Sequence, residues 1–547
     1  MNTQLENKIY DTIVVGAGIS GVSAAYHLKK YSPKADFLVL EGRENFGGTW
    51  DLFKYPGIRA DTDMHTMGFS FKPWNSKKFI ADGPSIMGYL NETIEENSLK
   101  NIIKFNMHIE SASWNSEDSL WELNVNNKKL NKLEVIRTKF IQMCAGYYSY
   151  ESGHKPFFKG SEDFTGQIIH PQEWDSSIDY ENKTVAVIGS GATAVTIVPE
   201  IAKKANHVTM IQRSPTYIVS YPSEYKILHL LNYISPKLAH KIIRLTNILR
   251  QRRIFKRARR SPKLVKDYIL GLVKKELPDF DIEKHFTPSY NPWEQRLCLA
   301  PDGDFFESIK INKVSIETEI IDSFSEKGVQ LDSGKLIEAD IIVTATGIKL
   351  QNFGGISIFV DGNEVDVSKS FIYKSMMYTQ IPNFINTFGY INASWTLKAD
   401  LTSKYACRLI NFMDDNNYAK CLPEAPEDLE ETKGFLDDFS SGYVRRAASI
   451  AVKQGNKKPW INNQNYLKDI FEINYGKIED NSLRFSEIFT INSYLYARIG
   501  ITIHISLFGL LYLPSGNNLY SKSNSSKARI RKFFKISFSF SASREPN

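Results

Sequence analysis

A glycine-rich turn between a predicted strand and a predicted helix constrains this chain of 547 residues more than any other feature. An apolar strand over residues 9–15 runs into GAGISG at residues 16–21, and helix-forming residues follow from 22 to 30. In such a turn the glycines permit a tight bend, a close approach to a pyrophosphate and packing of the helix on the strand. A second strand, residues 37–40, ends at Glu41, an acid placed to accept a hydrogen bond from a ribose hydroxyl. These features predict a βαβ unit that binds a dinucleotide.

The same pattern recurs later in the chain. Residues 184–188 form a predicted strand, GSGATA follows at residues 189–194, and a strand over residues 207–211 precedes Arg213. A carboxylate at the ribose position suits a free 2′-hydroxyl, whereas a cation there suits a 2′-phosphate. The sequence therefore predicts FAD at the first turn and NADPH at the second. The alternative is that Arg213 is an ordinary surface arginine.

Cysteine usage separates this chain from other enzymes with two nucleotide folds. A disulfide reductase needs a redox-active cysteine pair beside the flavin, and residues 42–51, which follow the acid of the first unit, hold no cysteine. The four cysteines lie far apart, without CxxC or metal-type spacing with histidine, at Cys144, Cys298, Cys407 and Cys421. We therefore expect no disulfide reductase, no metal site and a cytoplasmic location. The polar amino terminus lacks the regions of a signal peptide, so we expect no export.

A third motif lies between the two turns. Residues 164–174 have the form FxGxxxHxxxW, built from Phe164, Gly166, His170 and Trp174. This pattern between two dinucleotide motifs resembles the fingerprint of Baeyer–Villiger monooxygenases, which are class B flavoprotein monooxygenases. The resemblance spans about residues 8–486 and is strongest in segments 47–52, 55–59, 189–195, 212–219, 291–298 and 392–400.

The resemblance implies a specific reaction. NADPH would reduce FAD, O2 would add at the C4a position of the flavin, and the resulting C4a-peroxyflavin would attack a ketone and give an ester or a lactone. A bare anion in a dry pocket is costly, so a fixed cation is needed. Arg296 matches the catalytic arginine of the family and Asp61 matches its partner acid. The alternative for Arg296 is a structural ion pair.

His170 is a candidate general acid or base, because an unperturbed histidine side chain titrates near neutral pH. In the family this histidine lies on the linker between the nucleotide domains and couples their motion. We therefore expect it to act in a hinge rather than in the chemistry.

The residues expected to contact the cofactors combine both glycine turns, the groups at the ribose positions and the segments that match the family. They are Gly16, Gly18, Ser20, Gly21, Glu41, Gly48, Thr49, Trp50, Asp51, Leu52, Arg59, Asp61, Ile109, Gly189, Ser190, Gly191, Ala192, Thr193, Ala194, Arg213 and Ser214. FAD and NADPH are the expected cofactors, and O2 and a small ketone or thio compound are the expected substrates. We expect no nucleic-acid partner, and the sequence leaves the oligomeric state open.

The expected fold is α/β, with two Rossmann-like dinucleotide-binding domains, for FAD and NADPH, and a helical insertion. The substrate pocket should lie where these parts meet. The expected boundaries are 1–149 with 350–486 for the FAD domain, 150–221 with 294–349 for the NADPH domain, 222–293 for the insertion and 487–547 for an atypical tail.

Two other functions stay open. A protonated flavin hydroperoxide oxidises sulfur or nitrogen in thioethers, thioamides or amines, and the sequence does not separate this reaction from ketone oxidation. Outside enzymes, the alternative is an idle protein that binds NADPH and flavin as a redox sensor. The presence of Arg296, Asp61 and His170 argues against idleness.

The net charge of +7 comes largely from two basic segments. In residues 250–260, arginine and lysine interleave with apolar residues at helical spacing. This pattern predicts the solvated face of an amphipathic helix. The alternative is contact with a membrane or a phosphate. The second segment, 522–535, lies in the tail. The apolar stretch before it, 499–513, is shorter than a membrane-spanning helix needs. For the tail, a disordered extension and peripheral contact with an anionic membrane both stay open.

Overall fold

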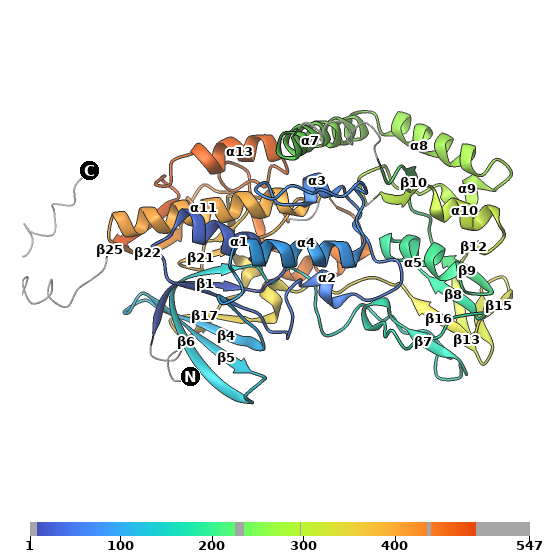
Figure 1. Cartoon of the computed structure of the whole chain (residues 1–547), viewed down its shortest axis with the longest axis horizontal. Helices are drawn as coiled ribbons and strands as arrows, with labels where there is room; N and C mark the ends of the chain where they lie inside the picture. The colour runs from blue at the N-terminus through green and yellow to red at the C-terminus, as the bar shows by residue number, and fades with distance from the viewer. Residues whose placement is uncertain (1–7, 225–234, 296, 435–438, 488–547) are drawn as a thin grey trace, which may run out of the picture. The chain divides into compact units, whose positions relative to one another are not determined.

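A computed structural model describes the fold over residues 8–224, 235–295, 297–434 and 439–487. The chain divides into two units, Met1–Ile488 and Phe489–Asn547. All described helices and strands belong to the first unit (Figure 1). The predicted tail lies outside the described residues from 488 onward, so both of its interpretations stay predictions.

A nine-stranded sheet surrounds the first glycine turn. β1 lies in the middle of its parallel half, because Ile13 is paired with Leu38 on one side and with Ile141 on the other. Val14 and its neighbours in β1 are buried, as expected for a strand covered on both faces. The parallel strands, in spatial order, are β3 (Ile103–Lys104), β2 (Phe37–Leu40), β1 (Ile9–Val15), β6 (Lys132–Met143) and β21 (Phe384–Asn386).

β6 belongs to both halves of this sheet. Its first part pairs antiparallel with β5, and its last part pairs parallel with β1 and β21. Trp114 and Trp121 face each other across the neighbouring strand pair and are buried, with ring centroids 5.5 Å apart. The other strands of this sheet are β4 (Met107–Asn115), β5 (Leu120–Asn127), β17 (Ser357–Val360) and β18 (Asn363–Glu364).

Helices from both ends of the chain cover the parallel half. The helix predicted from Val22 begins at Ile19 and packs against a helix of the carboxyl-terminal part, and both contribute to one core. The helices are α1 (Ile19–Tyr31), α2 (Thr49–Leu52), α3 (Met64–Met67), α4 (Gly83–Glu96), α11 (Trp395–Asp415), α12 (Gly442–Arg446) and α13 (Tyr466–Tyr475). Short strand pairs complete this part: β19 (Ile372–Tyr373) with β20 (Met377–Tyr378), β22 (Tyr418–Pro423) with β25 (Leu483–Glu487), and β23 (Glu431–Gly434) with β24 (Lys453–Gly455).

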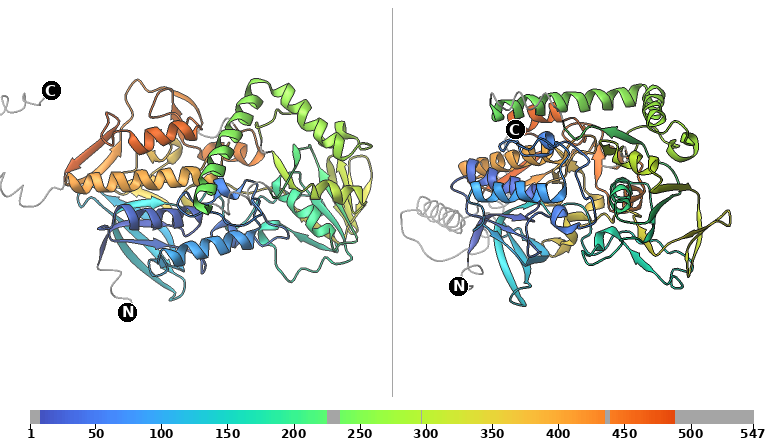
Figure 2. Two further views of the ribbon diagram at one scale, coloured as in Figure 1. Left: turned by 45° about the horizontal axis from the view of Figure 1, so that its top comes forward. Right: turned by 45° about the vertical axis from the view of Figure 1, so that its right-hand side comes forward.

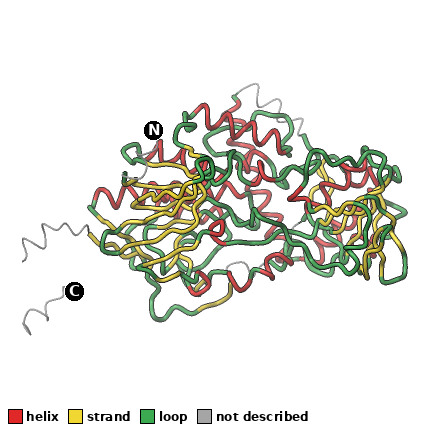
Figure 3. Tube along the Cα trace, turned by 90° about the horizontal axis from the view of Figure 1, so that it is seen from below, coloured by secondary structure: helices red, strands yellow, loops and turns green. Residues whose placement is uncertain are grey.

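A second, wholly parallel sheet surrounds the second glycine turn. Its spatial order is β12 (Val314–Thr318), β9 (His207–Gln212), β8 (Thr184–Ile188), β16 (Ile341–Thr344) and β7 (Gln167–Ile169). Beside it lie α5 (Ala192–Ala202), α10 (Asp304–Lys310) and an antiparallel sheet of β13 (Ile321–Ser325), β14 (Gly328–Leu331) and β15 (Leu336–Glu338). Figure 3 shows the strands gathered in two groups, separated by helices and loops.

The predicted insertion is helical. It leaves the second sheet region through β10 (Ile218–Tyr221) and returns through β11 (Cys298–Pro301), which pair in parallel. Between them lie α7 (Pro236–Arg260), α8 (Pro262–Glu276) and α9 (Ile282–Phe286). Ser235 caps α7, and Pro262, which cannot continue the helix before it, opens α8. No helix within the described ranges is long and apolar enough to cross a membrane.

Candidate active site

The first glycine turn is closed on itself. Gly16 has a φ of +94°, and a Cβ there would lie 2.9 Å from the carbonyl oxygen of Cys144. A Cβ on Gly21 would lie only 1.8 Å from the carbonyl oxygen of Gly16. The helix α1 begins directly after Gly18, so its first N–H groups face the space in front of the turn. Only glycine fits at these positions without a backbone shift.

Glu41 lies at the end of β2 and is 6% exposed. Its Oε2 accepts a hydrogen bond of 2.7 Å from the backbone N–H of Ala17, and its Oε1 accepts one of 3.0 Å from the N–H of Arg43. Burial raises the pKa of Glu41, and the two backbone hydrogen bonds oppose that rise. Each carboxyl oxygen has a further lone pair, so the side chain can still accept from a hydroxyl.

A second loop covers the first turn. The N–H of Gly47 donates to the carbonyl oxygen of Ala17 at 2.9 Å, and Gly48, at a φ of +56°, caps α2. Arg43 donates to the carbonyl oxygen of Gly48 at 3.2 Å and pairs with Asp51 at 2.8 Å. Sequence reasoning missed Arg43, because no motif contains it. Asp51, expected at a cofactor, orients this arginine.

The second turn is more open. Gly189 has a φ of +135°, and a Cβ there would lie 2.4 Å from the carbonyl oxygen of Ala345. A Cβ on Gly191, which precedes α5, would have no described atom within 4 Å of it. The hydroxyl of Ser190 donates to the carbonyl oxygen of Ser214 at 2.8 Å. Arg213 follows β9 and is exposed, and no side chain of the described part of the chain forms an ion pair with it.

Both turns line one cleft of about 2020 Å³. Most of the residues predicted at cofactors line it: Gly16, Gly18, Ser20, Glu41, Gly48, Thr49, Trp50, Leu52, Arg59, Asp61, Ile109, Gly189, Ser190, Gly191, Ala192, Thr193, Arg213 and Ser214. Three predicted residues lie outside the described lining, because Gly21 and Ala194 are buried in their helices and Asp51 faces Arg43. Arg296 lies outside the described residues.

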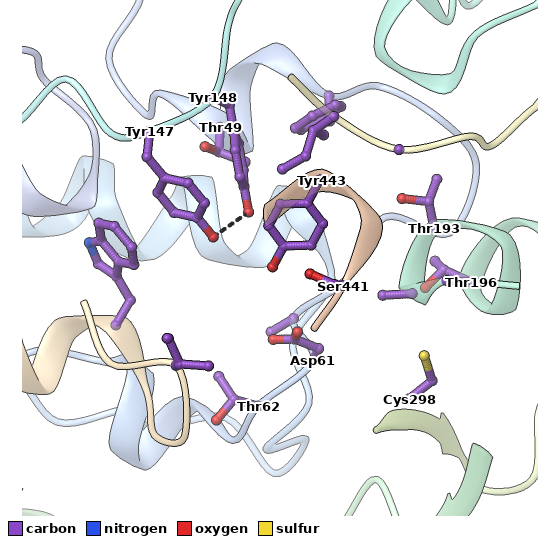
Figure 4. A pocket seen from close by; sticks show the side chains of 18 of the residues that line it. Thr49, Asp61, Thr62, Tyr147, Tyr148, Thr193, Thr196, Cys298, Ser441 and Tyr443 are labelled. Atoms are coloured by element: carbon purple, nitrogen blue, oxygen red, sulfur yellow. Dashed lines mark hydrogen bonds between the residues drawn. The ribbon is translucent and has the colours of Figure 1, made fainter. Parts of the chain in front are cut away.

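The middle of the cleft collects polar side chains from distant segments (Figure 4). Asp61 comes from the loop before α3, and Ser441 and Tyr443 come from the carboxyl-terminal part at α12. The hydroxyls of Tyr147 and Tyr148, which follow β6, are hydrogen-bonded at 2.9 Å. Sequence reasoning missed these three tyrosines and the serine, since nothing in their local sequence brings them together.

Aromatic packing fixes one wall of the cleft. Trp395, the first residue of α11, donates from Nε1 to the hydroxyl of Ser20 at 2.7 Å. Its ring stacks on Tyr147, with centroids 5.1 Å apart and an angle of 18° between the planes. Ser20 was expected at a cofactor, and it lines the cleft while its hydroxyl holds this tryptophan.

Arg59 joins the two sheet regions. Its guanidinium pairs with Asp304, the first residue of α10, and its backbone bridges Asp82. The arginine still lines the cleft. Its charge is therefore already balanced by a protein carboxylate.

His170 braces the linker between the sheets. Its Nε2 lies 3.1 Å from the carbonyl oxygen of Gly347, and its Nδ1 accepts from the N–H of Gln172 at 3.2 Å. Burial lowers the pKa of His170, so the ring is neutral near pH 7 and donates from Nε2. The side chain is outside the lining formed by the described residues of the cleft. Its position favours a mechanical role over proton transfer.

Two described protein families match parts of this chain. The family described as NAD(P)-binding Rossmann-like domain matches residues 14–81, and the family described as L-lysine 6-monooxygenase/L-ornithine 5-monooxygenase matches residues 95–349. The FAD-containing monooxygenase EthA of Mycobacterium tuberculosis strain H37Rv is 47% identical over 480 residues, which are 87% of this chain and 98% of that protein. The probable FAD-binding monooxygenase AlmA of Acinetobacter baylyi is 45% identical over 484 residues, 88% of this chain and 97% of that protein.

Solved structures share the fold. OTEMO in complex with FAD and NADP has a TM-score of 0.69 at 19% identity, over 87% of this chain and 99% of that chain. Oxidised steroid monooxygenase bound to NADP has a TM-score of 0.68 at 21% identity, over 88% of this chain and 100% of that chain. The predicted α/β fold with two Rossmann-like parts and a helical insertion is therefore confirmed.

Two dinucleotide turns that open into one cleft define a flavin-dependent oxidoreductase of the two-nucleotide type. Within that class, the chain belongs to the FAD-containing monooxygenases. The predictions of a monooxygenase and of FAD as its cofactor are thereby confirmed.

Proposed function

We propose that this monooxygenase uses NADPH and inserts one atom of O2 into a ketone to form an ester or a lactone. The observation that carries the proposal is the single cleft lined by both glycine turns. A nucleotide at the second turn would share this space with the flavin at the first. When bound, FAD supplies the redox chemistry, because it accepts a hydride from the nicotinamide and passes electrons to O2.

The first turn fits the diphosphate of FAD. Gly16 and Gly18 line the cleft, and the amino end of α1 offers unpaired N–H groups and the positive end of a helix dipole. A Cβ on Gly48 would lie 3.1 Å from the Cα of Gly18, and the φ of Gly48 is +56°, so glycine suits this cradle better than a residue with a side chain. We assign the ribose hydroxyl to Glu41.

The second turn fits NADPH. The open space at Gly191 lets a diphosphate reach the N–H groups that begin α5. Arg213 stands exposed at the end of β9, where a 2′-phosphate would lie. We therefore assign selection of NADPH over NADH to this arginine.

Oxygen insertion needs a fixed positive charge where negative charge develops on oxygen. We assign that charge to Arg296, which lies outside the described residues. Its chain neighbours Gln295 and Leu297 both line the cleft, which supports the assignment. Asp61 lines the same cleft and is assigned the role of orienting the guanidinium.

Turnover of a cyclic ketone tests the proposal. With the FAD-loaded protein, NADPH and ¹⁸O-labelled O2, we expect the ketone to raise NADPH consumption about twofold or more, and the lactone to carry one labelled oxygen. Arg296→Ala should stay folded, keep FAD and still be reduced by NADPH, yet lose lactone formation by about 10²-fold or more. Arg296→Lys, which keeps a charge, is the matched control, and Asp61→Ala should show a milder loss.

The same assay with a thioether decides between the proposed reaction and the other open functions. If the protein forms the sulfoxide but no lactone, its function is oxidation of sulfur or nitrogen and not of ketones. Binding of FAD and NADPH without substrate-dependent NADPH consumption would mean an idle binding protein. If Arg296→Ala forms lactone at a rate within about threefold of wild type, Arg296 is not the cation that stabilises the developing negative charge.

We further propose that the protein acts in the cytoplasm with peripheral contact at a membrane. Four cysteines of the described chain are free and buried, which suits a reducing compartment. Cell fractionation tests the location, because a peripheral protein leaves the membrane pellet at high salt whereas an inserted one does not.

A further inference from the structure

The long helix α7 carries an unusual charge pattern. Ten of its 25 residues are lysine or arginine, and it contains neither aspartate nor glutamate. It lies at the edge of the first unit (Figure 2). Of its exposed bases, Lys237, Lys241, Arg253, Lys256, Arg257 and Arg260 form no ion pair with any described carboxylate. The helix therefore presents uncompensated positive charge.

One line of residues along α7 also presents apolar surface. Leu238, Ile242, Leu245 and Leu249 follow one another at spacings of four, three and four residues, so they share one face. Each is between 37% and 54% exposed. The same spacing then continues through Arg253, Lys256 and Arg260. One exposed face is thus apolar in its first half and basic in its second. We call this face the α7 stripe.

The opposite face of α7 fixes how the helix is oriented. Asn247 donates to Oδ1 of Asp63 at 2.9 Å. Arg244 donates to the carbonyl oxygens of His65 and Gly68 at 2.8 and 2.7 Å, and its other nitrogen lies 3.7 Å from Asp400. These buried polar contacts cannot be made if the helix rolls about its axis. The α7 stripe therefore faces outward as a consequence of the fold.

We propose that the α7 stripe docks the protein on an anionic lipid surface. A helix that places apolar side chains among lysine and arginine suits the boundary between headgroups and acyl chains. A second copy of the chain docked through the same helix would bring like charges together, because α7 has no acidic residue to pair with them. A nucleic acid would neutralise the charge but leave four apolar side chains in water. Lipid satisfies both halves of the stripe.

The helix that carries the α7 stripe also lines the cleft. Arg250 and Phe255 of α7 line the cleft, as do Leu264 and Tyr268 of α8, which are 51% and 65% exposed. The helix that carries the α7 stripe and the helix after it thus both line the cleft. An apolar substrate dissolved in the bilayer would reach the cleft without crossing bulk water. Delivery of substrate rests on the proposed oxygenation of a ketone, whereas the docking itself does not.

Vesicle binding by the full-length, FAD-loaded protein tests the proposal without any turnover. We expect binding to phosphatidylcholine vesicles that contain about one-third phosphatidylglycerol, and at least tenfold weaker binding to phosphatidylcholine alone. Leu245→Glu should lower binding to the anionic vesicles at least tenfold, since it removes apolar surface and adds a negative charge. Lys256→Gln should lower it about fivefold, the equivalent of ~1 kcal/mol for one charge near the surface.

Leu133→Glu is the matched control, because Leu133 is 66% exposed in β6, on a sheet remote from α7. Its binding should equal that of the wild type. All variants keep residues 489–547, so equal binding of Leu245→Glu and wild type would assign the contact to the tail or another surface and overturn the proposal. If Lys256→Gln weakens binding to anionic vesicles but Leu245→Glu does not, the helix binds polyanions in general. That result would also overturn the proposal. Lactone formation from a water-soluble ketone should be unchanged in Leu245→Glu, which separates docking from chemistry.

Discussion

The two glycine turns share a strand–turn–helix plan but differ in what surrounds them. At the first, residues 47–52 close over the turn, and Glu41 is buried with both carboxyl oxygens bound to backbone N–H groups. At the second, Gly191 faces open space and Arg213 is exposed. The third position differs too, because Gly21 cannot accept a Cβ whereas its counterpart is Ala194.

This difference separates a retained cofactor from an exchanging one. A ligand held by buried groups and a covering loop leaves only when that loop opens. A ligand held by an exposed charge and an open helix end can bind and leave in each turnover. The first turn is therefore suited to FAD and the second to a nicotinamide nucleotide. Three substitutions test whether the two turns differ in this way.

The largest effect is expected from Gly21→Ala. The added methyl group would lie 1.8 Å from a backbone oxygen, so the turn must shift, at a cost of about 3 kcal/mol or more. We expect a lower melting temperature and a purified protein with less than a tenth of its FAD, measured by absorbance. The control, Ala194→Gly in the second turn, should cost about 1 kcal/mol and leave FAD bound. Full flavin occupancy in Gly21→Ala would show that the first turn is not closed.

Arg213→Ala should have an intermediate and more selective effect. Loss of a charge-assisted contact of about 1.5–3 kcal/mol raises the KM for NADPH roughly 10- to 150-fold. The KM for NADH should change little, because NADH has no 2′-phosphate. Arg213→Lys should have a KM for NADPH between those of wild type and Arg213→Ala. The FAD content of both variants should be unaffected. Equal changes for NADPH and NADH would show that Arg213 is an ordinary surface arginine.

The smallest effect is expected from Gly191→Ala. Its Cβ meets no described atom within 4 Å, so stability and flavin content should match the wild type within about 0.5 kcal/mol. The methyl group would instead meet the diphosphate of the nucleotide, and the KM for NADPH should rise about threefold to tenfold. Thermal unfolding and initial rates measure the two quantities separately. A large loss of stability would mean that the second turn is as tightly packed as the first.

The sequence predicted what local chemistry determines. The turns at Gly16 and Gly189, the acid at Glu41 and the cation at Arg213 all follow from spacing, because strand, turn and helix are adjacent in the chain. Contacts between distant segments could not be predicted in this way. Tyr443 lines the cleft although it lies in the carboxyl-terminal part of the chain. No pattern in residues 439–446 predicts this position.

Ion pairs show the same limit. Arg59 was placed at a cofactor by resemblance, yet its partner Asp304 lies 245 positions later in the chain. Asp51 was placed there too, and its pairing with Arg43 could not be read from the sequence. A carboxylate does not reveal from sequence whether it will meet a ligand or a neighbouring arginine, because both offer the same hydrogen-bond donors. The exposed α7 stripe is different again, because its spacing is visible in sequence but its outward orientation depends on the buried contacts of Arg244 and Asn247.

The position of β6 also has a consequence for synthesis of the chain on the ribosome. β6 ends at Met143, but β21, which fills its second parallel edge, begins only at Phe384. While the intervening residues are translated, a strand of buried and mostly apolar residues has an unpaired edge, which is a template for joining other chains. Production of the protein should therefore depend on chaperones that shield this edge. Slowing translation between these two strands would lower the yield of soluble enzyme without changing the finished fold.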